Sequence, residues 1–109
     1  MVTAGNVVLL DFAGAMGTKR HPAVVLSTAA YYAHRPDAIL GLLTTNTTKS
    51  NTPTDFILQD WAEAGLFKLT AFRAYLITSE HSTLSAIGTL CGRDWLGVQV
   101  CLQRALQLT

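Results

Sequence analysis

Three basic residues in a row, Lys19, Arg20 and His21, are the side chains of this sequence that most clearly suggest chemistry. They follow Gly17 and precede Pro22, after which comes a run rich in β-branched residues. Such a run is typical of a buried strand, and a proline fits its first position or an edge. Lysine and arginine bind phosphate oxygens, and an imidazole acts as base or acid near neutral pH. The segment therefore predicts an anion-binding loop held by a rigid strand, with solvated surface charge as the alternative.

The most polar stretch of the chain, from Thr44 to Thr54, carries a dense set of hydroxyl and amide side chains. It directly follows an apolar run, 38–45, that is typical of a buried strand. Its composition predicts a loop, and its hydroxyl groups are available as hydrogen-bond partners. We therefore expect a second polar segment that a rigid strand positions.

The composition limits which classes of function remain. Charged residues make up 14% of the 109 residues and hydrophobic ones 50%, whereas an average soluble domain carries roughly 25% charge. A small chain this apolar should bury surface against another subunit, so we predict an oligomer. The formal net charge of +1 excludes nucleic-acid binding driven by overall charge. Any such binding needs a local basic patch.

The cysteines and histidines do not predict a metal site. Cys91 and Cys101 lack a metal-ligand spacing, and on one helix they would stand about 15 Å apart, beyond the reach of a disulfide. His34 and His81 have no Cys or His close by in sequence. No apolar segment approaches the ~20 residues that span a membrane, and the N-terminus lacks the regions of a signal peptide. We therefore expect reduced cysteines and a soluble, intracellular protein.

Hydrophobic periodicity predicts a mainly β chain that ends in a helix. Short apolar or alternating runs predict six strands, at 6–12, 23–26, 38–45, 55–58, 68–78 and 84–90. A loop is expected at 13–21 and turns at 27–35 and 59–66, with Ser27 as a possible helix cap. The last apolar residues recur at three and four positions, which predicts an amphipathic helix: Trp95, Val98, Leu102 and Leu106. The fold class is α+β, a small and partly open barrel in a single domain, 1–109.

The segment 68–78 alternates and is therefore expected to have two different faces. One face would carry Arg73 and Tyr75 together with Ala71 and Ile77, and the other face would be apolar. Arg73 is thus a charged side chain on a predicted strand, where it needs a phosphate or a carboxylate partner.

Taken in order, these pieces resemble the MazF/PemK (Kid) family of bacterial toxins over nearly the whole chain. The signature is a glycine loop followed by a proline and a valine-rich strand, here 17–27. An apolar strand that ends in a threonine pair, and an arginine strand, are also similar to family segments. The other similar segments are the opening strand, in which Asn6 replaces an acidic residue, and the C-terminal strand and helix. The matching ranges are 5–12, 17–27, 42–46, 70–74 and 87–90.

The resemblance implies an SH3-like β-barrel (Kid/CcdB-like) with a C-terminal amphipathic helix that works as a homodimer in the bacterial cytoplasm. Most members of the family cut single-stranded RNA (mRNA) at short sequences without a metal or other cofactor. The 2′-hydroxyl attacks the adjacent phosphorus, which leaves a 2′,3′-cyclic phosphate (or a 3′-phosphate) and a 5′-hydroxyl end. The partner is a cognate antitoxin, a segment that folds on binding and covers the RNA groove. The resemblance implies no membrane contact.

The resemblance also implies site residues. The family's catalytic threonine falls on Thr44, and the arginine of the Kid branch falls on Arg73. The arginine that precedes the proline is replaced by His21, while Arg20 stands one position earlier and would point the other way on a strand. An acidic residue of the Kid branch is replaced by Tyr75. RNA-binding residues are expected to be Lys19, Thr45, Asn46, Thr47 and Lys49.

Three interpretations of His21 remain open. It substitutes for the arginine, or Arg20 swings in from a mobile loop, or activity is weakened or lost. Thr44 is alternatively only a strand-end threonine, and Arg73 only the partner of an aspartate, Asp55 or Asp11. For the whole chain, the alternatives to a ribonuclease are an inactive relative that keeps antitoxin or RNA binding, and a non-enzymatic gyrase poison like CcdB. The poisons depend on a Trp-Gly-Ile end, which this chain lacks.

Overall fold

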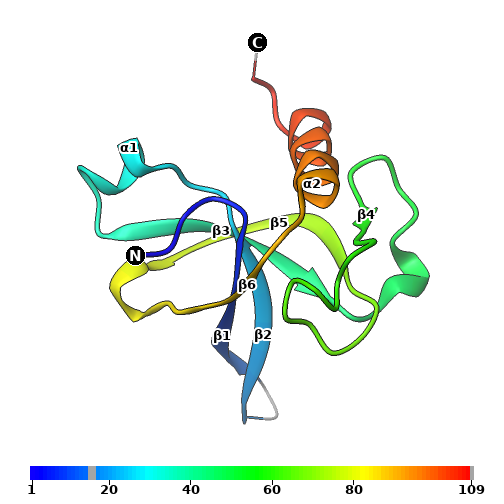
Figure 1. Cartoon of the computed structure of the whole chain (residues 1–109), viewed down its shortest axis with the longest axis horizontal. Helices are drawn as coiled ribbons and strands as arrows, with labels where there is room; N and C mark the ends of the chain where they lie inside the picture. The colour runs from blue at the N-terminus through cyan, green and yellow to red at the C-terminus, as the bar shows by residue number, and fades with distance from the viewer. Residues whose placement is uncertain (15–16, 109) are drawn as a thin grey trace.

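One antiparallel sheet of six strands forms the body of the protein, in the order β4-β5-β3-β2-β1-β6. The computed structural model describes residues 1–14 and 17–108. The sheet curls into a partly open barrel, and the C-terminal helix packs at one end of it (Figure 1). This confirms the predicted mainly β barrel with a C-terminal helix. The strands are β1 (Asn6–Gly14), β2 (Gly17–Val25), β3 (Asp37–Thr44), β4 (Phe56–Ile57), β5 (Ala71–Glu80) and β6 (Ala86–Thr89). The helices are α1 (Ala29–Tyr32) and α2 (Gly92–Ala105), with 3-10 turns η1 (Thr47–Lys49) and η2 (His81–Thr83).

Strand β2 begins earlier than the sequence predicts. The loop expected at 13–21 is wrong for residues 13–14, which belong to β1, and for residues 17–21, which belong to β2. The two strands pair in a register that runs from Gly14↔Gly17 to Val7↔Val24. Residues 15 and 16 of that expected loop lie outside the described residues. The basic residues are thus held on a hairpin strand, because β1 supplies backbone partners that a local reading of the sequence does not reveal.

Pro22 lies within β2, where only one side of the strand is paired. Strand β2 pairs with β1 up to Val24 but with β3 only over residues 23–25. Up to Pro22 the second side of β2 therefore behaves as an edge, which suits a residue that lacks an N–H donor. Of the two positions that the sequence leaves open for Pro22, the edge is the one observed.

Other boundaries shift by a few residues. Strand β3 is displaced by one residue from the predicted 38–45. Strands β4 and β6 are shorter than the predicted 55–58 and 84–90, and β5 extends to Glu80. Helix α2 ends at Ala105, so Leu106 lies just beyond it. Ser27 does not cap α1: its hydroxyl donates to the Tyr32 hydroxyl at 2.9 Å and accepts from the Ile39 N–H at 3.0 Å. This buried serine instead joins α1 to β3.

The core divides into two clusters, one on each side of the sheet. Helix α2 and β5 close the first through Val98, Cys101 and Phe72, with Trp61 and Trp95 packed against it. The second lies between the sheet and α1 and contains Tyr32. Gly41 is needed in β3 because a Cβ there would collide with the Phe72 ring. The sheet is thus buried on both sides along its centre, which fixes the strand ends that carry the polar residues.

Strand β5 contains a bulge at the position where Arg73 and Tyr75 leave the sheet. The pairing with β3 passes from Gly41↔Leu76 to Leu43↔Phe72, so three residues of β5 lie opposite Leu42 alone. Ala74, at the centre of the bulge, has a φ of 56°, which is uncommon for a residue with a side chain. Bulges often re-aim side chains next to functional sites.

Candidate functional site

One cavity of about 440 Å³ brings together three of the four predicted catalytic residues. His21 on β2, Thr44 at the end of β3 and Arg73 in the β5 bulge all line it. Leu42 and Leu43 complete its apolar side. A cavity of this size is within the range that small ligands occupy. The site therefore combines an imidazole, a hydroxyl and a guanidinium, which are groups able to move a proton and to bind a phosphate.

Thr44 is the last residue of β3, and its hydroxyl is oriented by the turn that follows. Its Oγ1 accepts the Asn46 N–H at 3.1 Å. Since this bond uses a lone pair, the hydroxyl proton remains for a ligand. The turn itself is fixed by the Asn46 side chain, which accepts from the Thr48 hydroxyl at 2.9 Å.

Arg73 lines the cavity and forms an ion pair with a buried aspartate, Asp55. Its Nε lies 3.9 Å from Oδ1 of Asp55, and 46% of the arginine side chain is exposed against 6% of the aspartate side chain. Of the two aspartates expected as structural partners, Asp55 is the one that Arg73 contacts. The ion pair does not remove Arg73 from the cavity, because a guanidinium carries five N–H donors.

Arg20 lies outside this cavity. Its Nε donates to Oδ1 of Asp11 at 3.1 Å, in a pair whose side chains are 69% and 60% exposed. It lines a second cavity, of about 290 Å³, together with Pro22 and Thr45. Neighbouring residues of a strand point to opposite faces, so His21 and Arg20 face different cavities as the alternation predicts. Thr44, the last residue of β3, and Thr45, just beyond the strand, also line different cavities.

The remaining predicted RNA-binding residues lie on the two segments that flank the cavities. Lys19 is exposed on β2, and Asn46 and Lys49 are exposed in and beside the turn η1. Thr47 is half-buried there. Strand β2 and the β3–β4 loop therefore carry all of the expected contact residues, and Thr45 lines the cavity of about 290 Å³ with Arg20.

Two residues of the site were not identified from the sequence. Tyr75 lines the cavity of His21, Thr44 and Arg73 and is 61% exposed, but the sequence predicts no site role for it. The sequence predicts Asp55 only as a structural partner of Arg73. The signal for Tyr75 was its predicted position on the Arg73 face, whereas Asp55 is brought near Arg73 only by the β4–β5 pairing.

A second polar cluster, at the start of α2, is structural. The buried carboxylate of Asp94 accepts the N–H groups of Gln59 and Asp60 at 2.9–3.1 Å. The Cys91 thiol and Arg93 both donate to Oδ2 of Asp60 at 3.0 Å. Asp60, Cys91 and Asp94 thus place three potential metal-ligating atoms within 4.8 Å of one another. These contacts already bind the segment around Asp60 to the helix.

Neither cysteine has the low pKa of a reactive thiol. The hydrogen bond to the Asp60 carboxylate raises the pKa of Cys91, because that bond stabilises the protonated form. Burial raises the pKa of Cys101. Both cysteines are free, as predicted.

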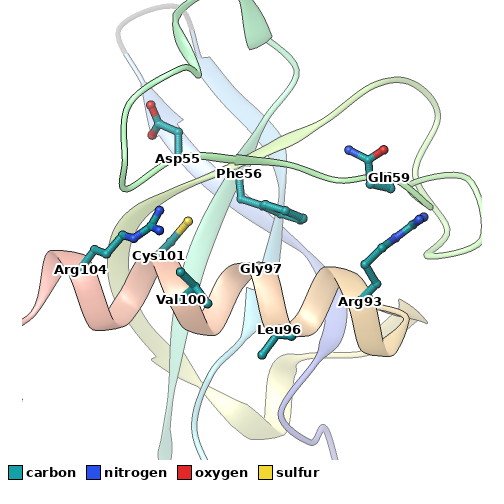
Figure 2. Close-up of a pocket in the computed structure, with 9 residues that line it drawn as sticks. All are labelled: Asp55, Phe56, Gln59, Arg93, Leu96, Gly97, Val100, Cys101 and Arg104. Atoms are coloured by element: carbon teal, nitrogen blue, oxygen red, sulfur yellow. The ribbon is translucent and has the colours of Figure 1, made fainter.

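A third cavity, of about 360 Å³, lies between α2 and the segment that contains β4. Figure 2 shows Arg93 and Arg104 at opposite ends of its helical wall, with Phe56 over the middle. Gly97 makes room for that ring, because a Cβ there would collide with it. Asp55 also lines this cavity, so its carboxylate lies between the helix and Arg73.

The comparisons with known proteins rest on structure. No family model matches the chain, and no curated protein sequence matches it. A chain from an endoribonuclease in complex with its cognate antitoxin, from a mycobacterial species, is 20% identical with a TM-score of 0.76. The alignment covers 100% of this chain and 98% of that one.

Two Deinococcus radiodurans structures agree with this match. A chain of the MazE–MazF complex is 22% identical over 99% of this chain and 98% of its own, with a TM-score of 0.76. MazF alone is 22% identical over 95% of this chain and 94% of its own, with a TM-score of 0.71. None of the described helices has the length and apolarity needed to cross a membrane. Over nearly its whole length, the chain has the fold of MazF.

Proposed function

We propose that this chain is a member of the MazF/PemK family, the toxin of a type II toxin–antitoxin pair, and a metal-free endoribonuclease that cuts single-stranded RNA. The observation that carries the proposal is the cavity that His21, Thr44 and Arg73 line together. These residues come from three separate strands, and the cavity lies in a chain with the fold of MazF.

The cavity residues suit attack by the 2′-hydroxyl of RNA on the adjacent phosphorus. His21 takes the 2′-proton as general base. Arg73 binds the phosphate oxygens and stabilises the charge of the phosphorane, and the Thr44 hydroxyl donates a hydrogen bond to the same group. The bond from phosphorus to the 5′-oxygen then breaks, and that oxygen takes a proton from Tyr75 or from water. The products are a 2′,3′-cyclic phosphate (or a 3′-phosphate) and a 5′-hydroxyl end.

Of the three interpretations of His21, the geometry favours the first. His21 lines the cavity of Thr44 and Arg73, while Arg20 is paired with Asp11 beside another cavity. For Arg20 to act on the same phosphate, that pair and the β1–β2 register would have to break. We therefore assign the proton transfer to His21 and give Arg20 a role in binding the RNA strand alongside Lys19.

Base selection is proposed for the β3–β4 loop. Thr45, Asn46, Thr47 and Lys49 follow Thr44 directly, so they lie next to the nucleotide that is cut. Their hydroxyl, amide and ammonium groups hydrogen-bond base edges and phosphates.

The partners proposed are a second copy of the chain and an antitoxin. The titles of the similar structures describe an endoribonuclease with its cognate antitoxin and MazE with MazF. Leu96 on α2, and Leu106 and Leu108 after it, are exposed apolar side chains that a dimer interface would cover. We place this toxin in the bacterial cytoplasm, where its RNA substrate is.

Cleavage in the presence of EDTA tests the proposed function. The chain is incubated with a long single-stranded RNA, and the ends of the fragments are analysed. We expect cuts at a short recurring sequence, each leaving a 5′-hydroxyl end. Fragments with 5′-phosphate ends, or cutting that EDTA abolishes, would contradict the proposed chemistry.

A further inference from the structure

We propose that Asp55 is a positioning residue for Arg73, because its carboxylate attracts the Nε side of the guanidinium and so turns the terminal nitrogens toward the phosphate of the RNA. This inference rests on the proposed function, which assigns no role to Asp55. It is drawn from the burial of the aspartate, from the way its two oxygens are used, and from the anchoring of the segment that carries it.

The two carboxylate oxygens of Asp55 are used differently. Oδ2 accepts the N–H of Thr52 at 3.2 Å and its hydroxyl at 2.8 Å. Oδ1 faces Nε of Arg73 at 3.9 Å. Thr52 thereby fixes the plane of the carboxylate, so Oδ1 has a defined direction. At 3.9 Å the contact is a charge–charge attraction that is longer than a hydrogen bond. It therefore leaves the N–H groups of the guanidinium available for a second anion.

The burial of the pair is asymmetric in the direction that positioning requires. Only 6% of the Asp55 side chain is exposed, while 46% of Arg73 is. The anchor therefore lies in the protein, where an ion pair is weakly screened, and the arginine extends from it into the open cavity. The Arg20–Asp11 pair is exposed on both sides and lacks this arrangement.

The segment that carries Asp55 is fixed at both ends. On one side Arg104 of α2 donates to the Pro53 carbonyl at 3.1 Å. On the other side β4 pairs with β5 through Phe56↔Phe72, next to Arg73, and Asp94 binds the backbone of Gln59. In Figure 2, Asp55 stands next to Phe56 on the segment that runs alongside α2, on the same side of the view as Cys101 and Arg104. Helix α2 thus sets the position of Asp55, and Asp55 sets that of Arg73.

The test compares Asp55→Asn with the wild-type chain in RNA cleavage and in NMR of the arginine Nε–H groups. We expect kcat per folded molecule to fall about 10- to 100-fold, the loss typical of a misplaced catalytic group, with KM within about threefold of wild type. The Arg73 Nε–H signal should shift. Adding Asp55→Asn to Arg73→Lys should cause no further loss of kcat, since each substitution alone already disrupts the Asp55–Arg73 pair. Glu63→Gln removes an exposed carboxylate from the neighbouring turn and serves as the charge-matched control.

The outcomes separate this inference from the proposed function. An unchanged kcat, or an unchanged Arg73 signal, would overturn the role of Asp55 even if the wild type cuts RNA. If the wild type does not cut RNA, the proposed function fails, and the NMR signal alone decides whether Asp55 holds Arg73. If Asp55→Asn does not fold, Thr52→Val keeps the carboxylate but removes one of its donors. That variant should lose about 3- to 10-fold in kcat, and full activity would overturn the proposal.

Discussion

At the scale of single residues, the site depends on which face of a strand each side chain occupies. His21 and Arg20 are neighbours in sequence, yet they line different cavities. Thr44 and Thr45 separate in the same way. A substitution at one position of each pair should therefore affect either the chemistry or the binding of RNA, and not both equally.

Thr44 gives the clearest prediction at this scale. Thr44→Val removes the hydroxyl at nearly constant volume, and we expect the rate of cleavage to fall at least about 100-fold because a phosphate donor is lost. The lost bond from the Asn46 N–H should cost about 1 kcal/mol of stability. Thr44→Ser keeps the hydroxyl and should stay within about tenfold of wild type. Equal rates for the valine and serine variants, measured per folded molecule, would remove Thr44 from the chemistry.

At the scale of elements, the position of the site depends on contacts between distant segments. The strand types, the helix and the alternation that places Arg73 and Tyr75 on one face were predictable from periodicity. The extension of β2 through the basic residues was not, because it arises from pairing with β1. The sequence offered Asp55 and Asp11 as partners of Arg73 and could not choose between them, since the β4–β5 pairing is what brings Asp55 to Arg73.

The packing of α2 on β4 predicts a contrast between two glycines of the same helix. Gly97→Ala would force a methyl group into the Phe56 ring, so we expect about 1–3 kcal/mol of destabilisation in urea unfolding. Gly92→Ala is the matched control, because a Cβ at Gly92 meets nothing within 4 Å. Its stability should be unchanged or higher, and equal effects of the two substitutions would contradict this packing.

The start of α2 predicts how Cys91 reacts. Its pKa lies above the ordinary 9.0, first because of the Asp60 carboxylate, so alkylation by iodoacetamide at pH 8 should be slower than for a free thiol. The rate should increase as the pH rises through the raised pKa. Because folding raises the pKa of Cys91, the contact with Asp60 stabilises the folded state at pH values below the ordinary thiol pKa. This stabilisation is lost as the pH rises through the raised pKa.

Asp60→Asn provides the control for this prediction. It removes the carboxylate that holds the thiol proton, so alkylation of Cys91 should become faster at pH 8. Cys101 is buried and should remain unmodified in the folded protein. Alkylation of Cys91 in the wild type as fast as that of a free thiol would show that the Asp60 hydrogen bond is absent in solution.

At the scale of the whole molecule, the prediction is a dimer. One chain has a mass of 11.8 kDa, and light scattering at micromolar concentration should give about twice that mass. The reason is that the exposed leucines on and after α2 would be buried in a dimer interface. Leu96→Glu should shift the mass toward the monomer, whereas Gln99→Glu, at another exposed position of the helix, should not. A monomeric wild type would contradict the proposed assembly.

The central claim is that His21, Thr44 and Arg73 form a metal-free ribonuclease site, and one comparison tests it most directly. Wild type, His21→Ala and His21→Arg are each incubated with a long single-stranded RNA in EDTA, and the fragment ends are identified. We expect the wild type to cut and to leave 5′-hydroxyl ends, and His21→Ala to be at least about 100-fold slower. Cutting only by His21→Arg would show that the natural chain is a disabled toxin. If none of the three proteins cleaves the RNA, the assignment of a nuclease site to this cavity is contradicted.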